Sequence, residues 1–537
     1  MMRRQPLSPL PFVLAVLCLA LVLSACTPFG GAPRPARSTT PSAALGDFAS
    51  VDPDYVYDQL AYLATHYLHR EAGFDANLSA SANGHDEFAA YWAAEMTRDL
   101  AGFAPHVRRD TFVPRGWRDR PSVVLGANVE VSVPGAAHPE QVVVIGCHYD
   151  GEAISTQSAN DDASGCAIEL GVARALAGYW RAHHVFPART LRFVIFDGEE
   201  QGLDGSFAYV NTTINGDLAH VVAMINEEQS GIAYPLRFLG KAANPQLNMW
   251  AEVSPRDNNR LYPAQSRLSA AQLAALGHFQ DLTRQAAALV FAHFQALGAG
   301  TLAYHGDNGQ DVAQAIFTRN QLGMVHVEED LLGSSDQMAF TLAGLPCATF
   351  VGNASYYQPD APPWSYPYDQ ASDTIQLMNT YANGGAAKAR ALTLSLALPA
   401  MLTTWLLSRP EVLGTATATT QPIAALSDVG QTLVGQPLAL DAAASLDPSG
   451  GAALRYSWDF GDGATASGVS VTHTYSRAGS YTLTLTVASP SGTTTVTKTL
   501  EVTSQPVVIA NPYTGHLLTG SPAPNPAVPL PTAVPGQ

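Results

Sequence analysis

The sequence predicts an α/β domain with a mixed, largely parallel sheet covered by helices on both faces, followed by a small all-β sandwich. Three observations support this prediction. Between about Pro53 and Leu407, short apolar runs alternate with longer segments of helical periodicity, as expected when helices connect parallel strands. A Thr- and Ala-rich stretch, Gly414 to Gln421, then interrupts this pattern. Beyond it, short strands separated by Gly, Ser and Asp turns are typical of a sandwich.

The first half of the chain is expected to alternate between helices and strands. Near its start, apolar residues such as Tyr55, Leu60 and Leu63 recur at helical spacing. The predicted elements are two helices between Pro53 and about Phe103, strands over Ser122 to Glu130 and Gln141 to Gly146, a helix from about Ala163 to Ala182, and strands over Leu191 to Phe196 and Val221 to Ile225.

The second half of the α/β region is expected to be mainly helical. An Ala- and Leu-rich segment from Ser269 to about Leu297 predicts a long helix, and Asp311 to Asn320 predicts a further one. Pro346 to Val351 is typical of a strand, and Asp373 to Leu407 is expected to hold one or two closing helices. The strands of the sandwich are expected to continue to about Val502.

Composition bounds the class of protein. With 537 residues, of which 47% are hydrophobic and 14% charged, the chain is long enough for one large core and a smaller module. Its formal charge of −17 and the lack of Lys or Arg runs exclude a typical nucleic-acid binder. Apart from Cys18 and Cys26 near the N-terminus, the cysteines Cys147, Cys166 and Cys347 are expected to be small buried residues without a disulfide framework.

The N-terminus carries a targeting pattern. Arg3 and Arg4 precede an apolar stretch from about Leu10 to Leu23, and Leu23-Ser24-Ala25-Cys26 follows. This pattern resembles a bacterial lipoprotein signal. The resemblance implies that Cys26 is lipidated and that the protein is extracytoplasmic and anchored to a bacterial membrane. A transmembrane helix is the alternative, although roughly 14 apolar residues are too few to span about 30 Å of hydrocarbon comfortably.

Acidic residues and a histidine follow three predicted strands, and a fourth polar cluster precedes a predicted helix. In open α/β sheets, the carboxyl ends of the strands form the usual site for ligands. Acids packed there without a cation would be strongly destabilising, so the pattern predicts a metal site. Asp162 or Ser164 of the fourth cluster also suits a plain helix cap. The four groups are His148 with Asp150, Glu199 with Glu200, Glu227 with Glu228, and Asn160 to Gly165.

These four groups resemble, in order and approximate spacing, the double-zinc aminopeptidases, family 28 of the metallopeptidases. The likeness extends from about Val51 to Leu407, with a divergent stretch between about Tyr234 and Leu331. It implies a zinc-exopeptidase-like fold and an extracytoplasmic aminopeptidase that hydrolyses peptides or proteins with a metal-activated water. The motifs that carry it are Gly146-Cys147-His148-Tyr149-Asp150, Ala159-Asn160-Asp161-Asp162-Ala163-Ser164-Gly165, Glu199-Glu200-Gln201-Gly202-Leu203-Asp204-Gly205-Ser206 and Ile225-Asn226-Glu227-Glu228.

Carried over residue by residue, the resemblance implies two divalent metal ions, which are zinc in the family. Asp161 would bridge both ions. His148 and Glu228 would complete the ligands of one ion, and Glu200 would bind the other.

The same resemblance implies two supporting roles. Glu199 would be the general base that takes a proton from the attacking water and passes it to the leaving amine. Asp150 would orient His148. Because the family usually has Asp at the Glu228 position, Glu227 is an alternative ligand. Pleat alternation and the motif alignment favour Glu228.

One departure from the family changes the expected metal. The family's last metal-binding His is replaced by Asp369 in Tyr368 to Thr374, and its Ser-Asp-His signature is here Ser335-Asp336-Gln337. One ion would then see Asp161, Glu200 and Asp369, an all-oxygen set. Such a set also suits Mn, Mg or Ca.

The second domain resembles a PKD (polycystic kidney disease) domain. The resemblance is carried by Trp458-Asp459-Phe460-Gly461-Asp462-Gly463, His473-Thr474-Tyr475 and the alternating run Tyr481 to Val487. Trp458 and Phe460 are expected to pack the sandwich core, and the module is expected to bind protein or polysaccharide or to act as a spacer. The expected boundaries are 1–25 signal peptide, 26–46 tether, 47–410 catalytic domain, 411–421 linker, 422–503 sandwich and 504–537 disordered Pro-rich tail.

Two other functions stay open on the sequence. One is a glutaminyl-cyclase-like enzyme, which uses a single zinc for intramolecular transfer. The other is a catalytically silent binding lipoprotein whose β-domain does the recognition. Metal content and turnover of aminoacyl-nitroanilides distinguish these two from a peptidase.

Overall fold

The computed structural model describes most of the chain between residues 50 and 512. The predictions made for Cys26 and Asp369 lie outside the described residues. The described stretches are 50–71, 84–113, 125–231, 237–238, 241–242, 249–259, 261–263, 265–296, 301–305, 311–315, 325–330, 333, 335–352, 370–381, 390–450 and 453–512.

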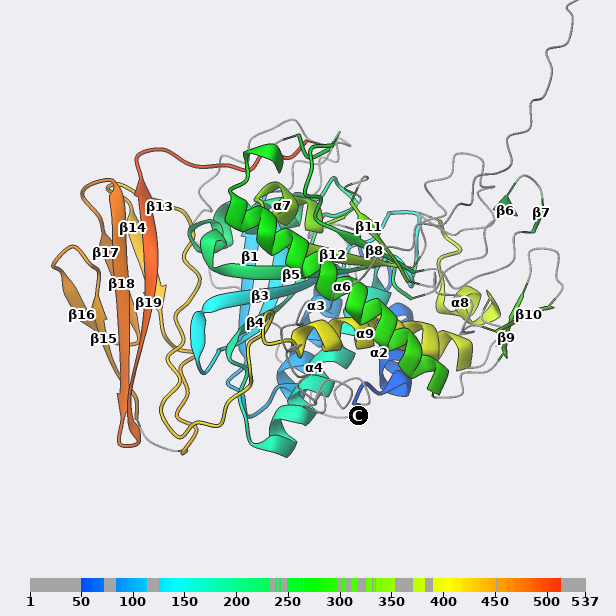
Figure 1. Ribbon diagram of the computed structural model, residues 1–537, viewed down its shortest axis with the longest axis horizontal. Coiled ribbons are helices and arrows are strands. Elements are labelled where there is room, and N and C mark those ends of the chain that lie inside the picture. Colours follow the sequence, from blue (N-terminus) through cyan, green and yellow to red (C-terminus); the bar gives the residue numbers. More distant parts are fainter. Residues whose placement is uncertain are drawn as a thin grey trace, which may run out of the picture. The chain divides into compact units, whose positions relative to one another are not determined.

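An eight-stranded sheet forms the centre of the first domain, in the order β1-β2-β4-β3-β5-β12-β8-β11 (Figure 1). The strands β4, β3, β5 and β12 run parallel to one another, β1, β2 and β8 are antiparallel to a neighbour, and β11 is parallel to β8. The predicted mixed, largely parallel sheet is therefore confirmed. Its strands are β1 His106–Phe112, β2 Gly126–Val133, β3 His138–His148, β4 Arg189–Phe196, β5 Val221–Glu228, β8 Met249–Val253, β11 Val325–Glu329 and β12 Cys347–Val351.

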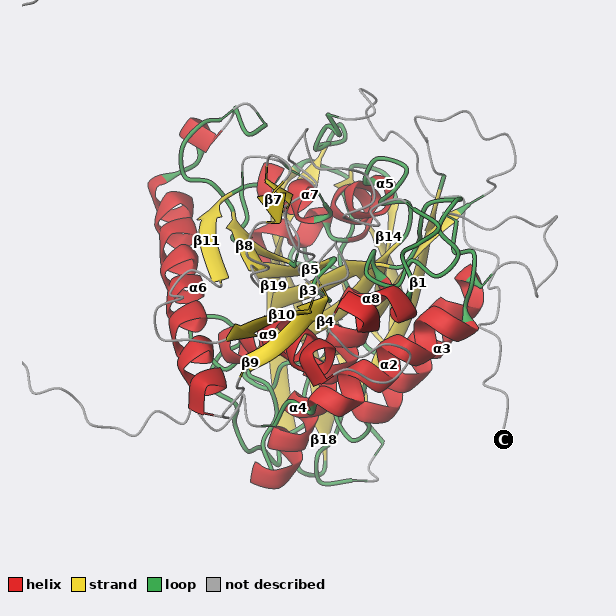
Figure 2. Ribbon diagram, turned by 90° about the vertical axis from the view of Figure 1, so that its right-hand side faces the viewer, coloured by secondary structure: helices red, strands yellow, loops and turns green. Residues whose placement is uncertain are grey.

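Helices cover both faces of this sheet (Figure 2). One hydrophobic core joins the sheet to α2, α3, α4, α6, α8 and α9, and a second core joins the opposite face to α5, α7 and the π-helical turn η1. The helical segments are α2 Pro53–His66, α3 His85–Asp99, α4 Ala163–His183, α5 Asp204–Ala208, η1 Tyr209–Thr213, η2 Asn215–His220, η3 Gln265–Arg267, α6 Ala270–Ala296, α7 Gln337–Leu342, α8 Ile375–Tyr381 and α9 Arg390–Leu407.

The central helix α4 begins beside the polar ends of the strands. Asp162 caps it by accepting a hydrogen bond from the backbone N–H of Gly165 at 2.9 Å. From Ala163 to Ala173 every residue is buried, which is possible because small residues let the helix approach the sheet closely. The helix ends at His183, and the next residue, His184, adopts a left-handed conformation that terminates it. The first turn of α4 is thereby fixed next to β3.

One predicted helix is wrong. Asp311–Ala315 forms the strand β10, which pairs antiparallel with β9, Thr301–His305. The pairing of Ala313 with Ala303 supplies cross-strand partners that an isolated apolar pattern could not reveal. A further short pair, β6 Arg237–Phe238 with β7 Lys241–Ala242, also lies in the divergent stretch.

The second domain has its own core of alternating inward-facing residues. Trp458 and Phe460 are fully or almost fully buried in it, as predicted, and the Tyr475 hydroxyl donates to the Phe460 carbonyl at 2.9 Å. The strands form one five-stranded and one two-stranded sheet. They are β13 Thr432–Leu433, β14 Pro437–Asp441, β15 Arg455–Asp459, β16 Thr465–Ser467, β17 Ser470–Thr474, β18 Gly479–Ser489 and β19 Gly492–Thr503.

Two further expectations concern the cysteines and the C-terminal segment. Cys147, Cys166 and Cys347 are buried free thiols, as expected. Residues 504–512, assigned from the sequence to a disordered tail, are described and make hydrogen bonds to the first domain. Among the described residues, no helix is long and apolar enough to cross a membrane.

Candidate metal centre

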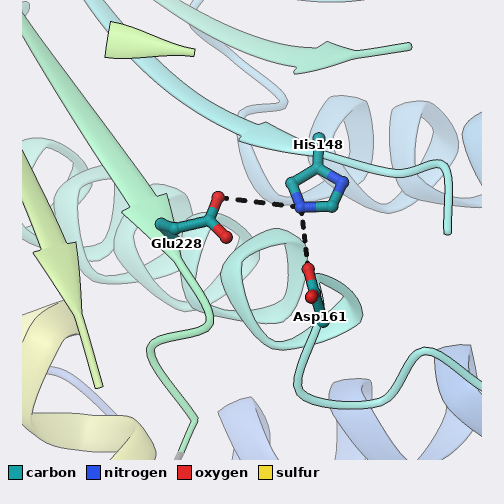
Figure 3. A group of neighbouring side chains, drawn as sticks. All are labelled: His148, Asp161 and Glu228. Carbon is teal, nitrogen blue, oxygen red and sulfur yellow. Dashed lines mark ion pairs between the residues drawn. The ribbon is translucent and has the colours of Figure 1, made fainter. Parts of the chain in front are cut away.

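Three side chains from separate elements converge at the carboxyl edge of the sheet (Figure 3). His148 ends β3, Glu228 ends β5, and Asp161 lies in the loop before α4. His148 Nε2 is 3.0 Å from Asp161 Oδ1 and 3.6 Å from Glu228 Oε2. All three residues are buried, and their ligand-type atoms lie within 4.8 Å of one another.

The imidazole of His148 is held from its other side by Asp150. His148 Nδ1 is 3.2 Å from the Asp150 carbonyl oxygen and 3.5 Å from its Oδ1. In this contact His148 Nδ1 carries the proton and donates a hydrogen bond to Asp150, which leaves Nε2 facing the two carboxylates. Burial lowers the pKa of His148, but Glu228 and Glu199 outweigh burial and raise it well above its usual value.

Glu228 points to this site and its neighbour Glu227 does not. Ser335 donates to Glu228 Oε2 at 2.6 Å and itself accepts from Asn226 Nδ2 at 2.9 Å. Glu227 lies on the opposite face of β5, where Thr403 donates to it at 2.5 Å. Burial raises the pKa of Glu227 to about 8. Of the two candidate ligands, the structure brings Glu228 to His148.

The loop that carries Asp161 is supported by two buried acids. Asp373 accepts hydrogen bonds from the backbone N–H groups of Asn160 and Asp161 at 2.9 and 3.0 Å. Burial raises the pKa of Asp373 to about 6, against the lowering effect of these bonds. Asp162 accepts from the backbone N–H of Gln229 at 3.1 Å and thereby ties the loop to the end of β5.

Glu199 and Glu200 follow β4 at the same edge but are not part of the three-residue group. Asp150 Oδ1 and Oδ2 accept from their backbone N–H groups at 3.1 and 3.3 Å. Glu200 Oε1 accepts from the backbone N–H of Glu152 at 3.2 Å. Glu199 is half-buried. Burial raises the pKa of its carboxyl well above the usual value; Glu228 adds to this effect and His148 opposes it.

Sequence reasoning missed two acids near this group. Asp336 is buried, and burial raises its pKa to about 7 even though His148 lowers it. It also lies close enough to Glu199 to raise the pKa of that carboxyl. Both acids stand in the sequence within motifs and were given no role there. Asp336 adjoins Gln337, and Asp373 follows Asp369 by four positions; these two departures from the family pattern are the signal that could have singled the acids out.

The donor set fits a divalent cation. An imidazole nitrogen and two carboxylates, buried and mutually within 4.8 Å, are the residue types that hold zinc. Asp150 behind His148 and Ser335 behind Glu228 supply the outer hydrogen bonds that metal ligands require. The buried carboxylates Asp161 and Glu228 both lie within 3.6 Å of His148 Nε2, and a bound cation would offset their combined negative charge.

Family models match both domains. Residues 128–272 match the model described as Peptidase family M28, and residues 419–504 match the PKD domain model. The first match contains His148, Asp161, Glu199, Glu200 and Glu228. The predicted resemblance of these two regions to family 28 metallopeptidases and to PKD domains is thereby confirmed.

Curated relatives agree with the first match over part of the chain. A protein of Pyricularia oryzae named "Probable zinc metalloprotease" is 33% identical over 151 residues, which cover 26% of this chain and 28% of that protein. The match therefore spans less than a third of that relative's length.

Solved structures that match this chain share low sequence identity with it. The LapA aminopeptidase of Legionella pneumophila is 15% identical with a TM-score of 0.40, covering 70% of this chain and 75% of that one. The glutaminyl cyclase of Macrostomum lignano is 16% identical with a TM-score of 0.42, covering 71% and 95%.

Proposed function

We propose that this chain is a metal-dependent peptidase, and specifically an aminopeptidase. The observation that carries the proposal is the convergence of His148, Asp161 and Glu228 within 4.8 Å, with Glu199 in the loop that follows the neighbouring strand β4. The family match over residues 128–272 supports the same reaction class. A divalent ion held by the three residues would supply Lewis acidity, which polarises the scissile carbonyl and makes water a better nucleophile.

The chain's own residues account for the proton transfers. Glu199 takes the proton of the attacking water and returns it to the leaving amine, as a carboxylate beside but outside the ligand group can do. Asp150 holds the backbone of Glu199 and the ring of His148 together, so the base and the ligand keep a fixed separation.

We further propose a second ion, bound by Asp161, Glu200 and Asp369. The motif order supports this set, and the hydrogen bond from the backbone N–H of Glu152 to Glu200 Oε1 keeps the Glu200 carboxylate at the same edge of the sheet. Because this set has only oxygen donors, it selects less strongly for zinc, and Mn, Mg or Ca can occupy it. Metal analysis of protein purified without added metal tests the proposal. Two ions per chain are expected, and a single ion would contradict the second site.

Turnover of aminoacyl-nitroanilides tests the reaction itself. The full chain is expected to hydrolyse them, to lose activity with a chelator and to regain it with zinc. Cyclisation of an N-terminal glutaminyl peptide with one bound ion would instead indicate the glutaminyl-cyclase alternative. Bound metal with neither reaction would indicate the binding-protein alternative. Each of these two results contradicts the peptidase proposal.

We also propose that the protein is extracytoplasmic and lipid-anchored through Cys26. The observation behind it is the lipobox-like Leu23-Ser24-Ala25-Cys26 after an apolar stretch. Labelled palmitate should enter the wild-type chain in a bacterial host and be absent from Cys26→Ser. Absence of label from the wild-type chain would contradict the anchor.

The PKD-type module, residues 422–503, is proposed to bind protein or polysaccharide near the substrate. Its match to the PKD domain model supports this role. The rate of the full-length protein should be compared with that of a chain lacking residues 421–537, on an insoluble substrate and on a small one. The ratio of the two rates should be larger on the insoluble substrate. An equal ratio on both substrates would contradict a binding role.

A further inference from the structure

The segment that follows the sandwich returns to the loop bearing Glu199 and Glu200. We call residues 504–511 the C-terminal strap; it is the orange-red segment that leaves β19 in Figure 1. At its end, the buried side chain of Asn511 donates from Nδ2 to the carbonyl oxygen of Gly202 at 2.8 Å. Gly202 lies three residues after Glu199.

The strap is attached at three successive points. Val507 offers its carbonyl to Asn215 Nδ2 at 3.2 Å. Ile509 exchanges two hydrogen bonds with the Asn211 side chain, at 2.7 and 2.9 Å, and packs against the core that contains α5 and α7. Asn511 then reaches Gly202. The path of the strap is therefore specified by side chains of the first domain.

The origin of the strap is also fixed. Lys498 on β19 is buried, and its Nζ lies 2.9 Å from Asp217 in η2 of the first domain. Asp217 also accepts from the backbone N–H of Val429 at 2.9 Å. Because a buried charge is costly without its partner, this pair holds the start of the strap against the first domain.

The loop that receives Asn511 is held both by its own backbone and by groups outside it. Its backbone closes on itself, since the Glu199 carbonyl accepts from the N–H groups of Gly202 and Leu203 at 2.8 and 2.9 Å. Leu203 adopts φ +64°, a left-handed conformation that residues other than glycine adopt reluctantly. Asp150 holds the entry to this loop at Glu199 and Glu200, and Asn511 holds its exit at Gly202.

We propose that Asn511 is a positioning residue for Glu199, so that the strap behind the sandwich completes the active-site loop. Asn511 acts through the Gly202 carbonyl and touches neither substrate nor metal. Fixing the exit of the loop narrows the range of positions that the Glu199 carboxylate samples, which favours proton transfer and leaves substrate binding unchanged. The expected effect on turnover rests on the proposed peptidase function. The expected effect on the backbone of the loop does not.

Two variants test the inference in the full chain. Asn511→Ala removes the side chain, and Asn511→Asp keeps its volume but replaces the donor with an acceptor facing a carbonyl. Asn215→Ala is the matched control. It removes a hydrogen bond of the same type, from the Asn215 side chain to the carbonyl of Val507, which lies in the strap four residues before Asn511. Hydrogen–deuterium exchange of the amides of Gly202 and Leu203 reports on the loop whether or not the enzyme turns over.

In both Asn511 variants the amide protons of Gly202 and Leu203 should exchange about fivefold faster than in wild type, as expected when one buried hydrogen bond is lost. Their kcat on an aminoacyl-nitroanilide should fall by about threefold to tenfold with KM and bound metal unchanged, whereas Asn215→Ala should match wild type. Wild-type exchange in both Asn511 variants would overturn the inference. Faster exchange with unchanged kcat would overturn the positioning role alone, and lack of turnover in wild type would count against the proposed function instead.

Discussion

The carboxylate of Asp150 accepts a hydrogen bond from the backbone N–H of Glu199, with 3.1 Å between Asp150 Oδ1 and that nitrogen. The same residue contacts His148 Nδ1 through its carbonyl oxygen at 3.2 Å. Asp150 was expected only to orient the histidine. The structure shows that its carboxylate also accepts from the backbone of the acid pair, so one residue sets the relative position of the proposed ligand His148 and the proposed base Glu199.

Asp150→Asn should therefore impair turnover more than metal binding. The amide keeps one acceptor but presents an N–H₂ group to the second backbone N–H, so one of the two loop bonds is lost. We expect kcat to fall by about 10- to 100-fold. Steady-state kinetics with metal analysis checks this. Wild-type kcat in the variant would show that the loop is held by other groups.

Glu227 and Glu228 provide a matched pair for the metal site. Glu228→Gln should lower zinc affinity by at least about 10-fold, because it removes a charged ligand from the three-residue group. Glu227→Gln should retain metal, since Glu227 faces Thr403 on the other side of the sheet and its pKa of about 8 makes it already neutral at pH 7. Competition with a chromophoric chelator measures both, and the reverse order of effects would contradict the ligand assignment.

Stability should decline as pH rises from about 6.5 to 9 because of His85. His85 Nε2 and Nδ1 lie 2.9 and 3.1 Å from Asp197 and Asp86, its ring contacts Tyr149, and Arg109 pairs with Asp86. Burial lowers the pKa of His85, but the two acids outweigh burial and raise it to about 9.

The sign of this effect follows from linkage. The folded-state pKa exceeds the unfolded value near 6.5, so the protonated histidine stabilises the fold fully below pH 6.5, and this contribution disappears as pH passes 9. A difference of about 2.5 pKa units corresponds to at most about 3 kcal/mol. Urea unfolding at pH 6 and 9 measures it, and His85→Gln should remove most of the difference. An unchanged pH dependence in that variant would exclude His85 as its source.

The buried pair Lys498 and Asp217 should matter for the stability of the whole chain. Lys498→Met removes the nearest cation of the buried Asp217 carboxylate, at 2.9 Å, and leaves it Arg192 at 3.9 Å; losing one partner of a buried pair typically costs about 3 kcal/mol. Thermal unfolding should therefore shift to lower temperature, and limited proteolysis should release the sandwich more readily. A wild-type melting temperature would indicate that the two domains are held together mainly by other contacts.

Much of the sheet and of the candidate site was predictable because local patterns specify them. Leu191 to Phe196 is a continuous apolar run, and the acids directly after such runs must meet at one sheet edge once the strands are parallel. The choice of Glu228 over Glu227 followed from pleat alternation, and the structure places Glu228 beside His148.

The remaining features depend on contacts between residues far apart in the sequence. Asp311 to Ala315 has helical composition but becomes a strand by pairing with Thr301 to His305. Asp373 acquires its role only because the chain returns to the Asp161 loop after more than 200 residues, where it accepts from the backbone N–H of Asp161. Asn511 likewise follows a Pro- and polar-rich context that looked like a disordered tail. No local periodicity encodes such long-range hydrogen bonds.

The most direct test of the account is the Glu199→Gln variant, assayed for bound metal and for aminoacyl-nitroanilide turnover on the same sample. Glu199 is assigned to proton transfer and lies outside the group formed by His148, Asp161 and Glu228. The variant should therefore bind metal like wild type while kcat falls by at least about 100-fold. Normal turnover with normal metal content would contradict the assignment of Glu199 as the base, and loss of metal would show that Glu199 is a ligand instead.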